Sequence, residues 1–166
     1  MRFRAIDVEV DEVEDGPAAE VAVENARRKA RAGAAQARPG EVVVAVDTVV
    51  AHDRKNWGKP GDADEARATL RALSGRTHEV VSGVVVGERS AVELTRVTFH
   101  DLGDGLLEWY LATGEWRGRA GGYAIQGRGG ALVSRVEGDY LNVVGLPVGA
   151  LAGLFGGFAA FLAEGN

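Results

Sequence analysis

Hydrophobic and polar residues follow two different periods along this chain, and each period predicts a different kind of element. Polar and apolar residues alternate over residues 3–10, which predicts a strand. Valine-rich runs over 41–51, 77–86 and 91–100 predict further strands, and a short turn joins the last two as a hairpin. A fifth strand is expected over 131–137.

Helical patterns lie between these strands. The helix expected over 17–36 opens with a proline, which suits the first helical position. Asp62 and Glu65 have the spacing of a capping box, so a helix is expected to begin there and to end near residue 74. A third helix is expected over 102–112. Helices and strands mixed in this way indicate a single domain of the α/β class.

The C-terminal segment 143–163 is apolar and carries no charge. Its largest side chains recur at steps of three and four residues: Leu151, Leu154, Phe155, Phe158, Phe161 and Leu162. Glycines and a proline interrupt the segment. We therefore expect a final helix that packs on the core rather than a membrane span.

Composition and charge exclude several classes of function. The 166 residues carry a net charge of −5, which argues against non-specific binding to nucleic acid, so no nucleic-acid partner is expected. A phosphorylated small molecule would need a local cationic pocket or a metal ion. The chain has no cysteine, which excludes disulfides and thiolate metal sites. The first residues lack the apolar core of a signal peptide, so we expect a cytoplasmic protein with no membrane partner.

Lys29 is the first candidate for a functional residue. Four charged residues form one stripe on its helix: Glu20, Glu24, Arg27 and Arg31. Lys29 lies roughly 200° round the helix from that stripe, at ~100° per residue, among small residues. Its ammonium group either reaches the surface from the edge of the core or points into a cleft.

Asp47 and Thr48 interrupt the valine-rich strand over 41–51. A buried carboxylate is costly unless it is paired or bound to a metal ion, and sites in α/β folds form at the ends of strands. Asp47 is therefore a candidate site residue, with a carboxylate that accepts hydrogen bonds from a neighbouring turn as the alternative.

Two loops also carry candidates. Lys59 stands between Gly58 and Pro60 in a loop expected over 52–60, where the residues needed for a P-loop are absent. Segment 114–127 combines five glycines with two arginines, two aromatic residues and an amide. Its composition fits a binding loop or a glycine-rich connector. The three histidines show no metal-binding spacing.

Taken in order, these segments resemble the Maf family of nucleoside triphosphate pyrophosphatases. The matching stretches are 11–12, 26–30, 45–50, 58–60, 73–80, 114–127 and 138–147. The resemblance implies a two-lobed fold like that of inosine triphosphate pyrophosphatases, with a mixed twisted sheet and flanking helices. It implies hydrolysis of pyrimidine or modified nucleoside triphosphates to the monophosphate and pyrophosphate, with a divalent metal ion, Mg²⁺ or Mn²⁺. It also implies a homodimer.

The resemblance assigns roles to seven residues. Asp47 matches the catalytic aspartate, which the resemblance implies is either a metal ligand or a base, and Glu12 would be a second metal ligand. The residues that match substrate-binding positions are Glu12, Lys29, Thr48, Lys59, Arg119 and Gln126. Arg119 stands where many members have lysine, which keeps the charge but changes the geometry of the donors.

One feature departs from the family pattern. Family members begin with a strand, a Ser-x-Ser-Pro-Arg-Arg loop that holds the triphosphate, and a helix. The present 166 residues contain no such loop, so we expect a Maf-like domain over 1–166 that lacks these elements. Two other functions stay open: a catalytically impaired protein, linked to cell division, that binds a nucleotide or a protein partner, and a fragment whose exposed strand edge drives association.

Overall fold

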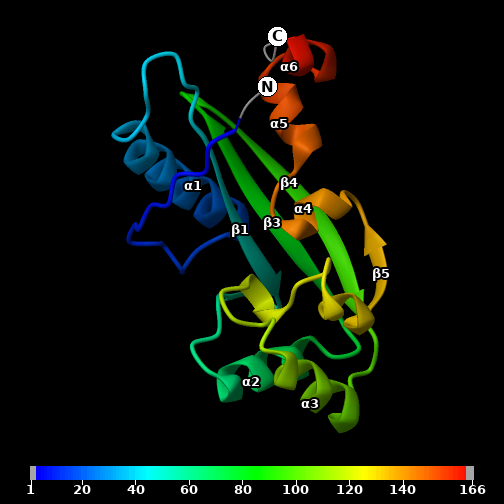
Figure 1. The fold of residues 1–166 in the computed structure, drawn as a ribbon. Coiled ribbons are helices and arrows are strands. Elements are labelled where there is room, and N and C mark those ends of the chain that lie inside the picture. Colours follow the sequence, from blue (N-terminus) through cyan, green and yellow to red (C-terminus); the bar gives the residue numbers. More distant parts are fainter. Residues whose placement is uncertain (1–2, 164–166) are drawn as a thin grey trace.

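The computed structural model describes residues 3–163, which fold around a five-stranded sheet in the order β2-β1-β3-β4-β5 (Figure 1). The strands are β1 (Val44–His52), β2 (Lys55–Trp57), β3 (Thr77–Val86), β4 (Arg89–Phe99) and β5 (Val133–Glu137). The α-helices are α1 (Ala18–Ala34), α2 (Ala63–Leu73), α3 (Asp104–Thr113), α4 (Tyr140–Val144), α5 (Val148–Leu154) and α6 (Phe158–Ala163). Two short 3-10 helices, η1 (Ala120–Gly122) and η2 (Arg128–Leu132), lie between α3 and β5.

The α/β class and the sheet with flanking helices are confirmed, but the strand directions differ from those expected. All strand pairs within residues 3–163 are antiparallel, whereas a mixed sheet was expected. Tight hairpins join β1 to β2 and β3 to β4, and since a hairpin can connect only antiparallel strands, they account for two of these pairs. Strand β2 was not expected at all, because residues 52–60 read as a loop. Asp53 and Arg54, both with positive φ, turn the chain between β1 and β2.

Helix α1 packs on one face of the sheet, against β1 and β3. Val21 and Ala22 of the helix form a small core with Val49 of β1. Gly83 of β3 allows this close packing, because a Cβ atom there would lie 2.5 Å from the backbone carbon of Ala22. Asp47 stands opposite Gly83 in the ladder, so the helix passes directly beside Asp47.

The main hydrophobic core lies at the other end of the long strands, where α2 and α3 pack. Its fully buried members include Leu70, Leu73, Leu107, Tyr110 and Phe99. Figure 1 shows α2 and α3 at one end of β3 and β4, and α1, α5 and α6 towards the other. This arrangement agrees with the two-lobed fold that was expected. The Asp62 carboxylate caps α2 by accepting from the N–H groups of Asp64 and Glu65, as the capping pattern predicted.

The N-terminal segment does not form the strand that was expected. Residues 3–14 make no sheet pairing and are mostly exposed, although their polar and apolar residues alternate. Side chains hold the segment to its neighbours instead: the Arg4 guanidinium donates to the backbone oxygen of Gln36, and Arg28 donates to that of Asp11. Alternation alone did not predict a strand correctly, because a strand also needs a hydrogen-bonding edge to pair with.

Three short helices, α4, α5 and α6, stand where a single final helix was expected. The first of them, α4, covers residues 140–144. Gly145 ends α4, and Gly156 and Gly157 separate α5 from α6, all three with positive φ. Leu151, Leu154, Phe155 and Phe161 pack on or beside the sheet with Val84, as the pattern of large residues predicted. Phe158 and Leu162, expected to pack there as well, have side chains outside the described part of the structure. No helix within residues 3–163 is both long and apolar enough to cross a membrane.

Candidate active site

Four charged side chains from four separate segments meet beside β1. Lys29 of α1 forms an ion pair with Asp47 of β1, and its Nζ lies 2.7 Å from Glu12 Oε1. Lys59, from the loop after β2, places its Nζ 3.3 Å from the same Glu12 oxygen. Two carboxylates and two ammonium groups therefore form one continuous chain of ion pairs.

Burial distinguishes these four groups. The Asp47 side chain is 7% exposed and that of Lys29 is 20% exposed, whereas that of Lys59 is half exposed. A buried charge is costly unless it is paired, so Asp47 and Lys29 depend on each other. Of the two interpretations of Lys29 from the sequence, the structure supports the one in which its ammonium group points into a cleft.

Opposing influences act on the pKa of Glu12 and of Lys29. Burial alone would raise the pKa of Glu12, but hydrogen bonds and charges from Lys29 and Lys59 lower it overall. Burial alone would lower the pKa of Lys29, but its bonds to Asp47 and Glu12 raise it overall. Both groups are therefore held in their charged forms at neutral pH.

Asn25 ties the N-terminal segment to the cluster. Its Nδ2 donates to Asp47 Oδ2 at 3.2 Å and to the backbone oxygen of Val13 at 3.0 Å. Its Oδ1 accepts from the Val13 N–H at 2.7 Å. The amide group therefore pairs with residue 13 as a neighbouring strand would, and this places Glu12 next to Lys29. Sequence reasoning missed Asn25, although it precedes Lys29 by four residues and so shares its face of the helix.

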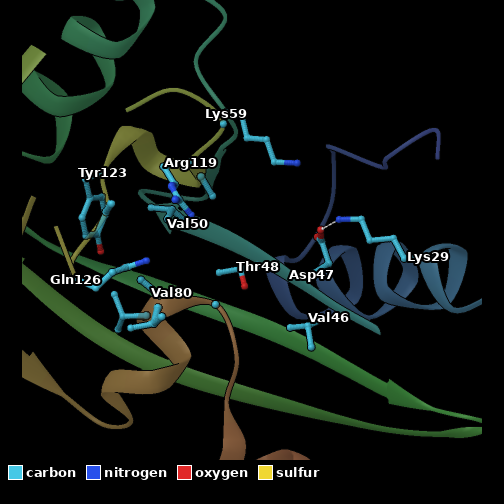
Figure 2. Close-up of a pocket in the computed structure, with 16 residues that line it drawn as sticks. Lys29, Val46, Asp47, Thr48, Val50, Lys59, Val80, Arg119, Tyr123 and Gln126 are labelled. Atoms are coloured by element: carbon cyan, nitrogen blue, oxygen red, sulfur yellow. Dashed lines mark hydrogen bonds and ion pairs between the residues drawn. The ribbon is translucent and has the colours of Figure 1, made fainter. Parts of the chain in front are cut away.

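A cavity of about 190 Å³ connects this cluster to the glycine-rich segment. Figure 2 shows Lys29 and Asp47 at one side of the cavity and Tyr123 and Gln126 at the other, with Thr48 between them. The Thr48 hydroxyl is paired with the hydroxyl of Ser82 on β3, at 2.8 Å. The cavity thus has a charged end and an end lined by an amide, an aromatic ring and aliphatic side chains.

Segment 118–127 forms one wall of the cavity and is not a loose connector. The Gly121 N–H donates to the backbone oxygen of Gly58 at 3.0 Å, which joins the segment that carries Arg119 to the loop that carries Lys59. Gly121 has a φ of 67°, and a Cβ atom there would lie 2.9 Å from the side chain of Val50. The glycine is therefore needed both for its conformation and for the contact with β1.

All seven residues expected from the sequence gather at this place. Six of them line the cavity: Lys29, Asp47, Thr48, Lys59, Arg119 and Gln126. Glu12 lies beside it, in contact with both lysines. Tyr123, Val80 and the 143–145 segment also line the cavity, and none of them was named as a site residue from the sequence. The last of these follows Asn142, which anchors α4 by donating to the backbone oxygen of Val80 at 3.0 Å.

Asp47 and Glu12 could hold a divalent metal ion. Both direct an oxygen at the same Lys29 ammonium group, so the two carboxylates converge on one point. Carboxylate oxygens suit Mg²⁺, which typically takes one or two of them and completes its shell with water and substrate phosphates. Within residues 3–163 no cluster of three or more His, Cys, Asp or Glu side chains offers a fuller set of ligands. The donors present fit a metal ion that binds together with a phosphate substrate.

Comparison with known proteins gives a consistent result. The family model described as "Maf-like protein" matches residues 1–158. A protein of Pyrococcus furiosus named dTTP/UTP pyrophosphatase is 46% identical over 145 residues, which cover 85% of this chain and 76% of that protein. Proteins with the same name from Myxococcus xanthus and Deinococcus radiodurans are 46% and 45% identical, over 93% and 90% of this chain and 81% and 78% of their own lengths.

The segments that build the cavity are the same segments that resembled this family in the sequence, and the family model spans both of its walls. This chain belongs to the Maf family of proteins.

Proposed function

We propose that this chain hydrolyses pyrimidine nucleoside triphosphates to the nucleoside monophosphate and pyrophosphate. The observation that carries the proposal is the division of one cavity into two ends: paired lysines and carboxylates at one, and Tyr123 and Gln126 at the other, with Thr48 between them. A nucleoside triphosphate is divided in the same way. The relatives named dTTP/UTP pyrophosphatase support this substrate class.

The cationic side chains bind the triphosphate. Lys29 and Lys59 lie at the charged end of the cavity, and Arg119 borders it from segment 118–127. Negative charge grows on the leaving pyrophosphate as its bond breaks, and fixed cations near that point stabilise the transition state. The chain as a whole has a net charge of −5, but these three side chains make this part of the surface locally positive.

Asp47 is the group that we assign to the attacking water. Its Oδ1 accepts from Lys29 and its Oδ2 from Asn25, so the carboxylate is held in one orientation. A water oxygen forms a bond to the α-phosphorus, and the bond from that phosphorus to the bridging oxygen breaks, with its electron pair leaving on pyrophosphate. The proton that the water loses passes to the Asp47 carboxylate and then to solvent.

Asp47 and Glu12 are also the residues that we assign to a divalent metal ion, Mg²⁺ or Mn²⁺. A bound metal ion offsets phosphate charge and lowers the pKa of coordinated water. Lys29 already contacts both carboxylates, so its ammonium group has to share them with that ion.

Thr48 and Gln126 face the nucleoside. A glutamine amide offers both a donor and an acceptor, and so do the O4 and N3–H groups of uracil and thymine taken together. The bond from Thr48 to Ser82 fixes the direction of the Thr48 hydroxyl. We infer that Gln126 contacts the base and that Thr48 contacts the nucleoside between the base and the phosphates.

Pyrophosphate release from a panel of canonical and modified nucleoside triphosphates, with Mg²⁺ or Mn²⁺, tests the proposal. The unaltered chain should release pyrophosphate from dTTP and UTP, and Asp47→Asn should lower kcat by at least about a hundredfold. Asp53→Asn is the matched control, because Asp53 is exposed and asparagine tolerates its positive φ. No release by the folded protein would contradict the proposal and favour a catalytically impaired, nucleotide-binding protein.

Two further expectations stay predictions. They are a location in the cytoplasm and assembly as a homodimer. Sedimentation of the protein at several concentrations tests the second of them.

A further inference from the structure

His78 and Tyr123 form a buried pair behind the wall of the cavity. His78 Nε2 lies 2.9 Å from the Tyr123 hydroxyl, although the two residues are 45 positions apart. Their rings meet edge to face with centroids 5.5 Å apart, and each also packs on Phe99 at 4.8 Å. His78 is 1% exposed and Tyr123 is 6% exposed.

The presence of a histidine in this buried cluster needs an explanation. His78 Nδ1 has no hydrogen-bond partner among the described residues, and a buried polar atom without a partner destabilises a fold. A phenylalanine or leucine in this core would avoid that cost. Burial, together with the nearby His52, lowers the pKa of His78 to about 4, so the imidazole is neutral at physiological pH. A neutral, enclosed imidazole cannot bind phosphate, so the pair has to act through Tyr123.

Tyr123 links this buried cluster to the cavity. Its side chain lines the cavity on the side opposite Asp47 and Lys29 (Figure 2). The next residue, Ala124, donates its N–H to the Tyr110 hydroxyl at 3.1 Å. Tyr123 and Ala124 are therefore two neighbouring anchor points in segment 118–127, and Gln126 lies two residues after Ala124.

Strand β3 supplies three consecutive side chains on this face of the sheet. Residues 78, 80 and 82 point the same way, because side chains alternate along a strand. His78 contacts Tyr123, Val80 lines the cavity, and Ser82 contacts Thr48. The side chains of β3 on this face thus support Tyr123 at one side of the nucleoside end of the cavity and Thr48 at the other.

We propose that His78 is a positioning residue for nucleoside recognition: through its hydrogen bond to Tyr123 it fixes the segment that presents Gln126 to the base. The inference rests on the proposed function, because it assigns this end of the cavity to the nucleoside. His78 itself contacts neither the substrate nor the reacting atoms. Without the bond, Tyr123 and Gln126 sample more orientations, and the nucleoside has to order them when it binds.

The test compares His78→Phe, which removes the hydrogen bond, with His78→Gln, which places an amide near the position of Nε2. We expect His78→Phe to raise KM for dTTP on the order of three- to tenfold, the value of one lost hydrogen bond, while kcat changes little. The inhibition constant for inorganic pyrophosphate should not change, because that product occupies the charged end. His78→Gln should restore most of the KM.

Two further variants separate positioning from general damage to the core. Val97→Ala is the matched control, because Val97 is fully buried and stands opposite His78 in the β3–β4 ladder. It should destabilise the protein without changing KM. The double variant His78→Phe/Tyr123→Phe should raise KM no further than the larger single effect, since both substitutions remove the same bond.

Hydrogen–deuterium exchange of the protein without ligand supplies a measurement that does not depend on turnover. Amides of residues 120–127 should exchange faster in His78→Phe than in Val97→Ala. Equal exchange in the two variants, or a KM for His78→Phe equal to that of the unaltered protein, would overturn the positioning role. If the unaltered protein releases no pyrophosphate, the proposed function fails, and the exchange comparison still decides whether His78 positions the segment.

Discussion

Asp47 lies directly opposite Gly83 in the ladder between β1 and β3, and the missing side chain at Gly83 determines what Asp47 contacts. Because Gly83 has no Cβ atom, the backbone of α1 rests on the sheet beside Asp47. Asn25 and Lys29 of that helix then reach the two oxygens of the carboxylate. Gly83, which has no side chain, is therefore part of the reason why the charged end of the cavity exists.

The first prediction tests this dependence with Gly83→Ala. The added methyl group would meet the backbone of Ala22, which cannot move as the end of a flexible side chain can. Forcing α1 away should cost about 1–3 kcal/mol of unfolding free energy and separate Lys29 from Asp47. Denaturant unfolding and pyrophosphate release measure the two effects.

Gly105→Ala is the control for that substitution. Gly105 lies in α3, where a Cβ atom would have no neighbour within 4 Å. Alanine in a helix is more stable than glycine, so this variant should be as stable as the unaltered protein or more so. Unchanged stability and activity of Gly83→Ala would show that the close packing does not position Lys29.

The sequence predicted most of the elements because their signals are local. The hairpin of β3 and β4 and helices α1, α2 and α3 each depend on periodicity, capping residues and turns within a short stretch. The position of Lys29, on the face of α1 away from the charged stripe, was predicted from the same local geometry. One failed prediction depended on a distant partner, because residues 3–10 alternate as a strand does but no sheet edge pairs with them. The other had a local cause, since the glycines at 145, 156 and 157 divided the expected last helix.

The candidate site shows the same limit. Asp47 stood out as a charge inside an apolar strand, and the order of the family motifs led to Glu12 and Gln126. Asn25 carried no such signal, because its importance comes from Val13 and Asp47, which lie 12 and 22 residues away. The pair of His78 and Tyr123 is likewise visible only when the fold brings β3 against segment 118–127.

The second prediction concerns competition between Lys29 and a metal ion. The Lys29 ammonium group contacts both Asp47 and Glu12, the two carboxylates proposed as metal ligands. Lys29→Met should therefore raise the affinity for Mn²⁺ in the absence of nucleotide by at least about tenfold, since a cation a few ångströms from the binding point is removed. Turnover should fall in the same variant, because a stabilising charge is lost.

Titration calorimetry with Mn²⁺ measures this affinity directly. Arg31→Met is the control, because it removes the same charge from an exposed position on the same helix. It should change neither metal affinity nor turnover. A Lys29→Met protein that binds Mn²⁺ more weakly than the unaltered chain would show that the lysine supports the metal site rather than competing for it.

The third prediction concerns the base. Gln126→Glu keeps the length of the side chain but removes its two N–H donors. The acceptor on the base then faces a carboxylate, so kcat/KM for dTTP should fall by about 10- to 100-fold. Gln36→Glu is a matched control on the surface, outside the cavity. An unchanged preference among bases in Gln126→Glu would remove this residue from base recognition.

The last prediction follows from the titration of His78. Burial, and next the neighbouring His52, lower its pKa from 6.5 to about 4 in the folded protein. Between these two values the unfolded chain binds a proton that the folded protein does not, so acid favours unfolding. The contribution of His78 to the unfolding free energy is fully present above pH 6.5 and is lost as the pH falls towards 4. The loss between pH 7 and pH 5 is on the order of 2 kcal/mol.

Unfolding in denaturant at pH 7 and at pH 5 measures this loss. In His78→Gln the decrease in unfolding free energy between the two pH values should be smaller, because glutamine does not titrate. His100→Gln removes an imidazole from an exposed position and should keep the full decrease. Tyr123, the other titratable group against His78, does not ionise in this range, because burial raises its pKa well above its usual value. An equal decrease in His78→Gln and in the unaltered protein would mean that His78 does not cause the acid sensitivity.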